Sequence, residues 1–213
     1  MSDDPLTVYF AGGLFDHKEL AGNLLLAQAA EKISGGRFRF VLPQNFEEAS
    51  SDAIAVRNND FKLLLTSDMI LANFDGLELD SGTVAEFCTA KFLDMPALLL
   101  RTDFRGGGER DSAPDPWNFM CSGWPRSETL RVNAMDELHA AAGDLNAFYA
   151  GLAERIAAAL DRLAATPSVL RKEELPGQFG LCLRLLGSGM TSVFSEGESR
   201  SIVESKIRKN LYR

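Results

Sequence analysis

The stretch MILANFDGLELDSGTVAEFCTAKFLDMPALLLR, residues 69–101, contains a strand, a helix and a second strand in succession. Residues 69–73 form a continuous apolar run of the kind that a parallel strand buried on both faces shows. A helix is predicted over 83–93, and a second apolar run follows at 97–101. Two buried strands joined by a helix predict a βαβ unit, and therefore a parallel sheet.

The same alternation continues on both sides of this unit. Further strands are predicted at residues 7–11, 38–42 and 129–132, and further helices at 16–34, 47–65 and 144–165. Strands that alternate with helices at this spacing form sheets with right-handed crossovers and helices on both faces. We therefore predict an α/β fold, a doubly wound (flavodoxin-like) five-stranded parallel sheet flanked by helices, with a C-terminal extension.

The chain changes character after Pro167, so we divide it into an α/β domain over 1–167 and an extension over 168–213. The extension contains the apolar run FGLCLRLLG at 179–187 and a basic end, KIRKNLYR. We expect it to be helical in part and to pack on the core or on a partner subunit. The apolar run is short for a helix that lies on a membrane surface. The role of the extension stays open at this point.

Composition excludes several classes of partner and site. The 213 residues carry 22 Lys+Arg and 30 Asp+Glu, a net charge of −8, which argues against nucleic acid or an anionic membrane as a partner. No apolar stretch approaches the roughly 18 residues of a membrane span. The start MSDDPLTVYF lacks the basic and apolar regions of a secretory signal, so we expect a cytoplasmic protein.

Histidine and cysteine are scarce, with two and three residues. A zinc site, a Cys–His pair or a Ser–His–Asp triad would have few residues to draw on. We therefore expect chemistry that depends on carboxylates and uses neither a metal nor an organic cofactor.

The candidate site follows from the predicted topology. Ligands of an open parallel sheet bind beyond the carboxyl ends of its strands, near the point where the strand order reverses. The residues that follow the first three predicted strands are therefore substrate-binding or catalytic candidates. They are Gly12, Phe15, Gln44, Asp75 and Asp80.

Glu86 has two interpretations. Thr83 and Glu86 have the spacing of a capping box, in which the glutamate only satisfies backbone donors at a helix start. Alternatively, Glu86 is a carboxylate kept ionised by the helix N-terminus and poised as a nucleophile. Asp80 could likewise be an ordinary loop residue, and Asp60 could lie on a solvated helix face.

Four segments together resemble the nucleoside 2-deoxyribosyltransferase family. Their order and the spacing from Asp60 to Asp80 to Glu86 suit the active-site pattern of that family, and the resemblance covers roughly residues 7–165. The segments are YFAGGLF at 9–15, RNNDFKLLLTSDMILANFDG at 57–76, LDSGTVAEFCTAKFLDMPALLLRTDFR at 79–105 and PWNFM at 116–120.

The resemblance implies roles for individual residues. Glu86 would be the nucleophile that attacks the anomeric carbon of the deoxyribose, and Tyr9 would orient its carboxylate by a hydrogen bond. Asp60 and Asp80 would hold the nucleobase and handle the proton that lets it leave. Gln44 would touch the base.

The resemblance also implies a homo-oligomer, either a dimer or a hexamer. Asn118 and Met120 would then come from a neighbouring subunit, with Asn118 reaching the sugar 5′-hydroxyl. The implied partners are a small deoxynucleoside and a free nucleobase.

The resemblance implies transfer of a 2-deoxyribosyl group between nucleobases, by a retaining double displacement through a covalent glycosyl–Glu86 intermediate. Cleavage of an N-glycosidic bond builds positive charge on the sugar, which a carboxylate stabilises, while a second acid protonates the leaving base. One alternative is a hydrolase of the same fold that acts on deoxynucleosides or their 5′-monophosphates. Another is an inert nucleotide-sensing module whose carboxylates only bind.

Overall fold

Five parallel strands form the centre of the computed structural model, which describes residues 4–46, 52–103, 118 and 120–213. The strands are β1 (Leu6–Ala11), β2 (Phe38–Val41), β3 (Met69–Asn73), β4 (Ala97–Arg101) and β5 (Ser127–Arg131). Their order in the sheet is β2-β1-β3-β4-β5, with every neighbouring pair parallel. This is the flavodoxin-like order, so the predicted fold class is confirmed.

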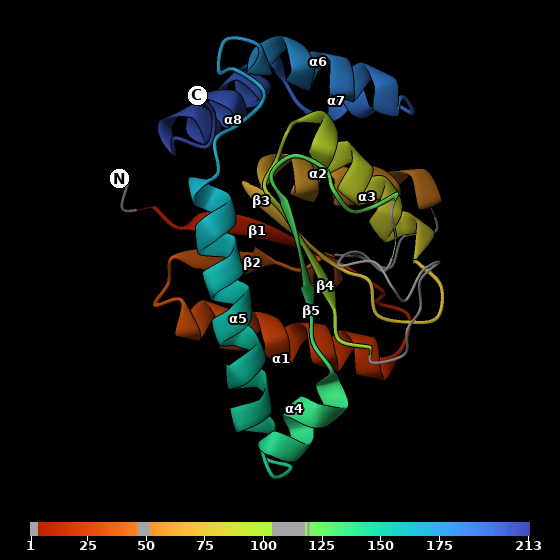
Figure 1. Ribbon diagram of the computed structural model, residues 1–213. Coiled ribbons are helices and arrows are strands. Elements are labelled where there is room, and N and C mark those ends of the chain that lie inside the picture. Colours follow the sequence, from red (N-terminus) through yellow and green to blue (C-terminus); the bar gives the residue numbers. More distant parts are fainter. Residues whose placement is uncertain (1–3, 47–51, 104–117, 119) are drawn as a thin grey trace.

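Helices cover both faces of the sheet (Figure 1). One face is covered by α1 (His17–Ile33) and α5 (Leu145–Ala165), and the other by α2 (Ala53–Thr66) and α3 (Ser81–Phe92). Successive side chains of a strand point to opposite faces. Val8 therefore packs with α1 and α5, whereas its neighbour Tyr9 belongs to the core beneath α2 and α3.

Side-chain caps explain where several helices begin. Asp16, Asp52 and Asp144 accept backbone N–H groups in the first turns of α1, α2 and α5, which satisfies donors that a helix start leaves unpaired. The Asp52 cap places the start of α2 at Ala53. The first part of the predicted range 47–65, residues 47–51, lies outside the described part of the chain.

The segment after β4 differs most from the prediction. Strand β5 begins at Ser127, earlier than predicted, and is followed by a short helix that was not predicted, α4 (Ala134–Ala140). A short 3-10 helix, η1 (Pro43–Asn45), was not predicted either. Residues 104–117 and 119, between β4 and β5, lie outside the described residues.

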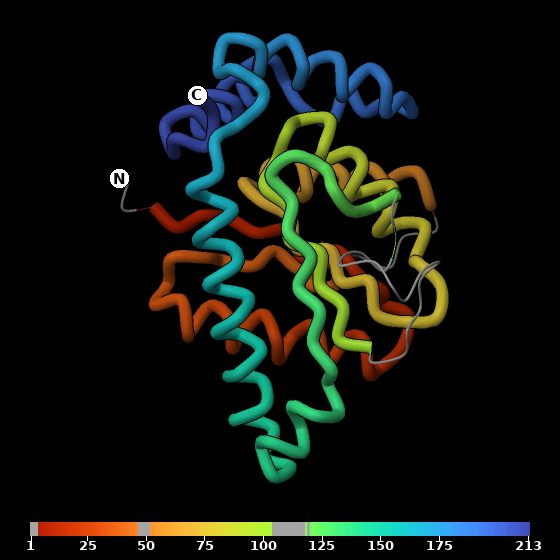
Figure 2. Tube along the Cα trace, in the orientation of Figure 1, coloured from red at the N-terminus to blue at the C-terminus, as the bar shows by residue number. Residues whose placement is uncertain are grey.

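The C-terminal extension forms α6 (Leu175–Leu186), α7 (Met190–Val193) and α8 (Glu196–Arg208). These helices, blue in Figure 2, lie over α2 and α3 and form an outer layer on that side. Phe179 and Met190 of the extension share one apolar cluster with Phe61 of α2 and Phe87 of α3. The extension therefore packs on the core of its own chain.

Within the described residues, every helix is too short or too polar to cross a membrane.

Candidate active site

A tyrosine and a glutamate meet beneath α2 and α3. Tyr9 lies on β1 and its side chain is fully buried. Its hydroxyl donates a hydrogen bond to Oε1 of Glu86, with 2.5 Å between the two oxygens. A bond from a neutral hydroxyl to a carboxylate is among the stronger hydrogen bonds in proteins and fixes the orientation of the acid. The structure thus brings together two residues that are 77 positions apart in the sequence.

The environment of Glu86 changes its ionisation. Burial, together with the charges of Asp60 and Asp80, raises the pKa of this carboxyl from its ordinary value of 4.5 to about 7. The hydrogen bond from Tyr9 acts in the opposite direction because it favours the charged form. The interpretation that the helix N-terminus keeps Glu86 ionised stays a prediction, and burial acts against it. Near neutral pH both forms of the carboxyl are populated.

Asp80 caps α3. Its Oδ2 accepts hydrogen bonds from the backbone nitrogen of Thr83 at 2.7 Å and from the Thr83 hydroxyl at 2.8 Å. Helix α3 therefore begins at Ser81, earlier than predicted. The expected capping box of Thr83 and Glu86 is wrong, because Asp80 occupies the cap position and Glu86 lies about one turn further into the helix. This places the Glu86 carboxyl against Tyr9 and away from the helix start.

Asp60 belongs to the same site. It lies in the middle of α2, is half-buried, and is close enough to Glu86 for its charge to raise the pKa of that carboxyl. The alternative of a fully solvated helix face is therefore wrong for this residue. Tyr9, Asp60, Asp80 and Glu86 form one cluster drawn from β1, α2 and α3.

Asn118 closes a turn in its own chain. Its Oδ1 accepts the backbone N–H groups of Met120 at 3.0 Å and Cys121 at 3.2 Å. The Trp124 indole donates to the Met120 carbonyl at 2.9 Å, and its ring packs edge-on against Phe87, with 5.8 Å between the ring centroids. The turn is thereby anchored against Phe87 of α3 in the same chain. The contribution of Asn118 and Met120 to a neighbouring subunit stays a prediction.

Three other predicted substrate-binding residues lie after β1 and β2. At Gly12 the backbone passes so close to Asn73 that an added Cβ would lie 3.2 Å from the Asn73 Cβ. The Phe15 side chain is 80% exposed. The Gln44 amide donates to the Leu20 carbonyl at 3.0 Å, so in this structure its nitrogen is bound to α1.

Asp75 joins the loops that follow β3 and β4. Its carboxylate accepts the backbone N–H groups of Thr102 at 2.5 Å and Asp103 at 3.0 Å, together with the Thr102 hydroxyl at 2.6 Å. The buried guanidinium of Arg101, the last residue of β4, donates to carbonyls of the segment after β3, those of Phe74 at 2.6 Å and Gly76 at 3.1 Å. Arg101 was not predicted, although an arginine that ends the apolar run ALLLR is a signal for such a role.

A cavity of about 290 Å³ lies on the opposite face of the sheet. It lies between α1 and α5, and Lys18, Asn23 and Tyr149 contribute polar groups to its wall. None of its lining residues belongs to α2 or α3, so it is distinct from the Tyr9–Glu86 cluster. Across the described ranges of the chain, no group of three or more His, Cys, Asp or Glu side chains is arranged to hold a metal ion.

Comparison with solved structures gives distant similarities. A conserved protein from Enterococcus faecalis V583 is 20% identical with a TM-score of 0.46, over 75% of this chain and 95% of that one. The 2-deoxyribosyltransferase of Bacillus psychrosaccharolyticus is 18% identical with a TM-score of 0.40, over 46% of this chain and 74% of that one. The enzyme of that name from Leishmania mexicana is 24% identical with a TM-score of 0.39, over 46% and 66%.

Family membership rests on the sequence match. No curated protein matches the chain. The family model described as nucleoside 2-deoxyribosyltransferase matches residues 8–120, more than half of the chain, and this range contains Tyr9, Asp60, Asp80 and Glu86. The chain belongs to the nucleoside 2-deoxyribosyltransferase family.

Proposed function

We propose that the protein transfers a 2-deoxyribosyl group between nucleobases through a covalent intermediate on Glu86. The observation that carries the proposal is the hydrogen bond of 2.5 Å from the buried Tyr9 hydroxyl to Oε1 of Glu86. This bond holds one carboxylate oxygen in place, and we assign the attack on the sugar to the other, Oε2. A buried, oriented carboxylate is the nucleophile that a retaining displacement at an anomeric carbon requires.

The first displacement forms the glycosyl–enzyme ester. Oε2 of ionised Glu86 attacks C1′ of the deoxynucleoside as the bond from C1′ to the base nitrogen breaks and its electron pair passes to the base. Asp60 and Asp80 hold the base and deliver the proton that neutralises it. Positioned acid–base catalysis of this kind contributes about 10²- to 10⁴-fold to a rate.

The second displacement reverses the first with a different base. A ring nitrogen of the incoming base attacks C1′, the ester bond to Glu86 breaks, and the carboxylate receives the electron pair. The proton of the incoming base returns to the Asp60–Asp80 pair. Two inversions at C1′ give overall retention. If water replaces the second base, the same steps give hydrolysis.

The substrate that we propose is an unphosphorylated deoxynucleoside. The turn after β1, Ala11-Gly12-Gly13-Leu14-Phe15, offers no serine or other small hydroxyl that would hold a 5′-phosphate. We further propose that the active protein is a homo-oligomer in which the turn at Asn118 contacts the sugar bound by a neighbouring subunit.

Base exchange tests the function directly. The protein is incubated with deoxyinosine or thymidine, with and without adenine, and the products are separated by chromatography. Deoxyadenosine that forms only when adenine is present supports transfer. Release of the free base without a new deoxynucleoside would establish a hydrolase instead, and absence of turnover would favour a binding module.

Subunit sharing is tested by mixing inactive variants. Glu86→Ala and Asn118→Ala proteins are each assayed alone and after mixing under conditions that exchange subunits. Recovery of activity on mixing requires a site built from two chains. If neither the mixture nor longer exchange restores any activity, Asn118 acts within its own subunit.

A further inference from the structure

The C-terminal extension binds the helix that carries Asp60. Nη2 of Arg57 donates to the carbonyl of Leu186 at 2.8 Å, and Nδ2 of Asn58 donates to the carbonyl of Ser188 at 2.8 Å. Arg57 and Asn58 belong to the segment RNND whose last residue is Asp60. The extension therefore contacts α2 within one helical turn of a proposed catalytic carboxylate.

The same extension also binds the C-terminus of α2. The ammonium group of Lys206, which is 1% exposed, donates to the carbonyl of Ser67, the residue that caps the C-terminus of α2. Lys209 then pairs with Asp68 at 2.6 Å. A cation at a helix C-terminus satisfies carbonyls that have no partner within the helix and interacts favourably with its dipole. Helix α2 is thus bound by the extension near its middle and at its C-terminus.

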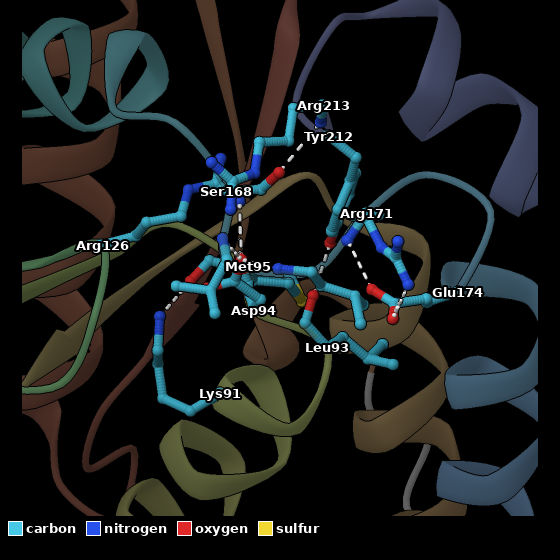
Figure 3. A network of polar contacts seen from close by, with 12 residues as sticks. Lys91, Leu93, Asp94, Met95, Arg126, Ser168, Arg171, Glu174, Tyr212 and Arg213 are labelled. Carbon is cyan, nitrogen blue, oxygen red and sulfur yellow. Dashed lines mark hydrogen bonds and ion pairs between the residues drawn. The ribbon is translucent and has the colours of Figure 1, made fainter.

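Helix α3, which carries Glu86, is fixed at its C-terminus. Gln178 donates to the carbonyl of Phe92 at 2.9 Å, and the hydroxyl of Tyr212 donates to that of Leu93 at 2.7 Å. Next to these bonds, the carboxylate of Asp94 accepts the backbone N–H groups of Val169 at 2.6 Å and Leu170 at 3.1 Å. Figure 3 shows Asp94, Tyr212 and Leu93 within one polar network between α3 and the extension.

The turn between α6 and α7 has a special conformation. Gly187, Ser188 and Gly189 have φ angles of 60°, 46° and 78°, all in the left-handed region. Glycine adopts this region without strain, whereas a residue with a Cβ does so at a cost. These φ angles bend the chain so that the carbonyls of Leu186 and Ser188 accept the bonds from α2.

We propose that the extension is a clamp that positions α2 against α3, and that Asn58 and Arg57 are positioning residues that hold Asp60 beside Glu86 through the turn 187–189. The inference rests on the proposed function for its catalytic consequence. Rates of positioned reactions depend steeply on geometry, and a shift of about 1 Å can cost about 10²-fold. A clamp that fixes α2 next to Asp60 and at its C-terminus would prevent such a shift.

Asn58→Ala removes one contact of the clamp and leaves Asp60 in place. Asn146→Ala is the matched control, because Asn146 is an exposed residue in the first turn of α5, on the other face of the sheet. The first measurement is the titration of the Glu86 side-chain carboxyl by carbon-13 NMR, with its signal assigned from its loss in Glu86→Gln. This measurement needs no catalytic activity.

The groups that affect the Glu86 carboxyl are Tyr9 from β1, Asp60 from α2 and Asp80 at the start of α3. Only Asp60 lies on the helix that the variant loosens. Because burial and the charge of Asp60 both raise the pKa of Glu86, a looser α2 shifts the titration midpoint of Asn58→Ala from about 7 toward 4.5. The Asn146→Ala midpoint stays at the wild-type value.

The second measurement is base exchange. We expect kcat to fall by about tenfold in Asn58→Ala, with KM changed by less than about threefold, because geometry at the reacting atoms is lost rather than ground-state binding. Gly187→Ala, which strains the turn on the other side of the same hydrogen bonds, should give the same shift and the same loss.

Two outcomes would overturn the clamp. In the first, both variants unfold at a lower temperature but keep the wild-type Glu86 midpoint and kcat, so the extension only stabilises the fold. In the second, neither variant differs from wild type in any measurement. If the wild type neither transfers nor hydrolyses, the proposed function fails, and the Glu86 titration still decides whether the clamp exists.

Discussion

On the face of the sheet covered by α1 and α5, the interior is almost entirely apolar. Val8 and Phe10 pack against Leu152, Ile156 and Leu160 of α5. The ion pairs on this side, such as Arg37 with Asp161 and Arg162 with Glu128, join exposed side chains. On the face covered by α2 and α3, charged groups lie inside the protein, including Glu86, Lys206 and the pair of Arg126 with Asp94.

The difference shows what a buried site demands of its surroundings. A buried polar group costs free energy unless hydrogen bonds or an opposite charge compensate for it. On the α2/α3 face that compensation comes in part from the extension, which caps the ends of both helices and adds an apolar layer outside them. The α1/α5 face needs no such layer, because two amphipathic helices bury their apolar sides directly.

Loss of the Glu86 carboxyl should have the largest effect. Glu86→Ala removes the proposed nucleophile, so base exchange should fall by more than the roughly 10²- to 10⁴-fold that a positioned acid or base contributes. The control is Glu154→Ala, an exposed glutamate of α5, which should keep wild-type activity. Both are measured by chromatography of the products after confirmation of the fold by circular dichroism. A Glu86→Ala protein that keeps more than a small fraction of the activity would refute the assignment.

The buried and exposed ion pairs should differ in their contributions to stability. Asp94→Ala leaves the buried guanidinium of Arg126 without its carboxylate partner and removes the acceptor for Val169 and Leu170, and should lower the free energy of unfolding by about 3–5 kcal/mol. Glu128→Ala breaks the exposed pair with Arg162 and should cost about 0–1 kcal/mol.

Urea unfolding of the two variants measures this difference. Equal losses in Asp94→Ala and Glu128→Ala would show that the polar network between α3 and the extension adds no more stability than a surface pair.

The two faces also differ in how far the sequence predicts them. The periodicity of apolar residues predicts the strands of the sheet and the helices α1 and α5, because burial on both faces of a strand and along one side of a helix leaves a regular pattern. The resemblance implies the pairing of Tyr9 with Glu86, which the structure confirms at 2.5 Å. The predicted start of α3 was wrong because aspartate and threonine, at positions 80 and 83, both make good N-caps, and only the folded geometry selects between them.

The contacts of the extension could not be predicted. Arg57 and Asn58 bind the carbonyls of Leu186 and Ser188, and every residue carries a carbonyl whatever its side chain. Lys206 and Tyr212 bind backbone carbonyls as well. Such partners leave no complementary pattern in the sequence, so the packing of residues 168–213 emerges only from the three-dimensional arrangement.

Ionisation of Glu86 should lower the free energy of unfolding above neutral pH. Its pKa is raised from 4.5 to about 7 in the folded protein, so the folded state favours the protonated form. The free energy of unfolding therefore keeps its full value below about pH 4.5 and falls as the pH rises through 7. The total loss is roughly 3 kcal/mol, because each unit of difference between the folded and unfolded pKa contributes about 1.4 kcal/mol.

Glu86→Gln has no such titration, so the variant should be more stable than wild type at pH 8 by up to about 3 kcal/mol and by much less near pH 5. Urea unfolding at both pH values checks the prediction, with Glu154→Gln as the control on the other face. A stability gain that does not depend on pH would contradict it.

Removal of the Tyr9 hydroxyl should lower kcat by less, and the direction of its effect on the pKa of Glu86 can be stated in advance. The hydrogen bond from Tyr9 lowers the pKa of Glu86, so Tyr9→Phe should raise that pKa above 7. The ionised fraction of Glu86 at pH 7 then falls, and kcat falls with it by about fivefold. At pH 9 most of the loss should disappear, because the carboxyl is ionised again.

Tyr149→Phe makes the same change on the other face, at a hydroxyl beside the cavity between α1 and α5. The pH–rate profile of that variant should match the wild type, whereas the acid limb of the Tyr9→Phe profile should move to higher pH. An acid limb that moves to lower pH would mean that the Tyr9 hydroxyl stabilises the protonated form of Glu86. A profile that drops equally at every pH would mean that Tyr9 orients the carboxylate without tuning its charge. A shift toward higher pH together with a lower maximal rate assigns both functions to the one hydrogen bond, and no residue on the α1/α5 face should reproduce it.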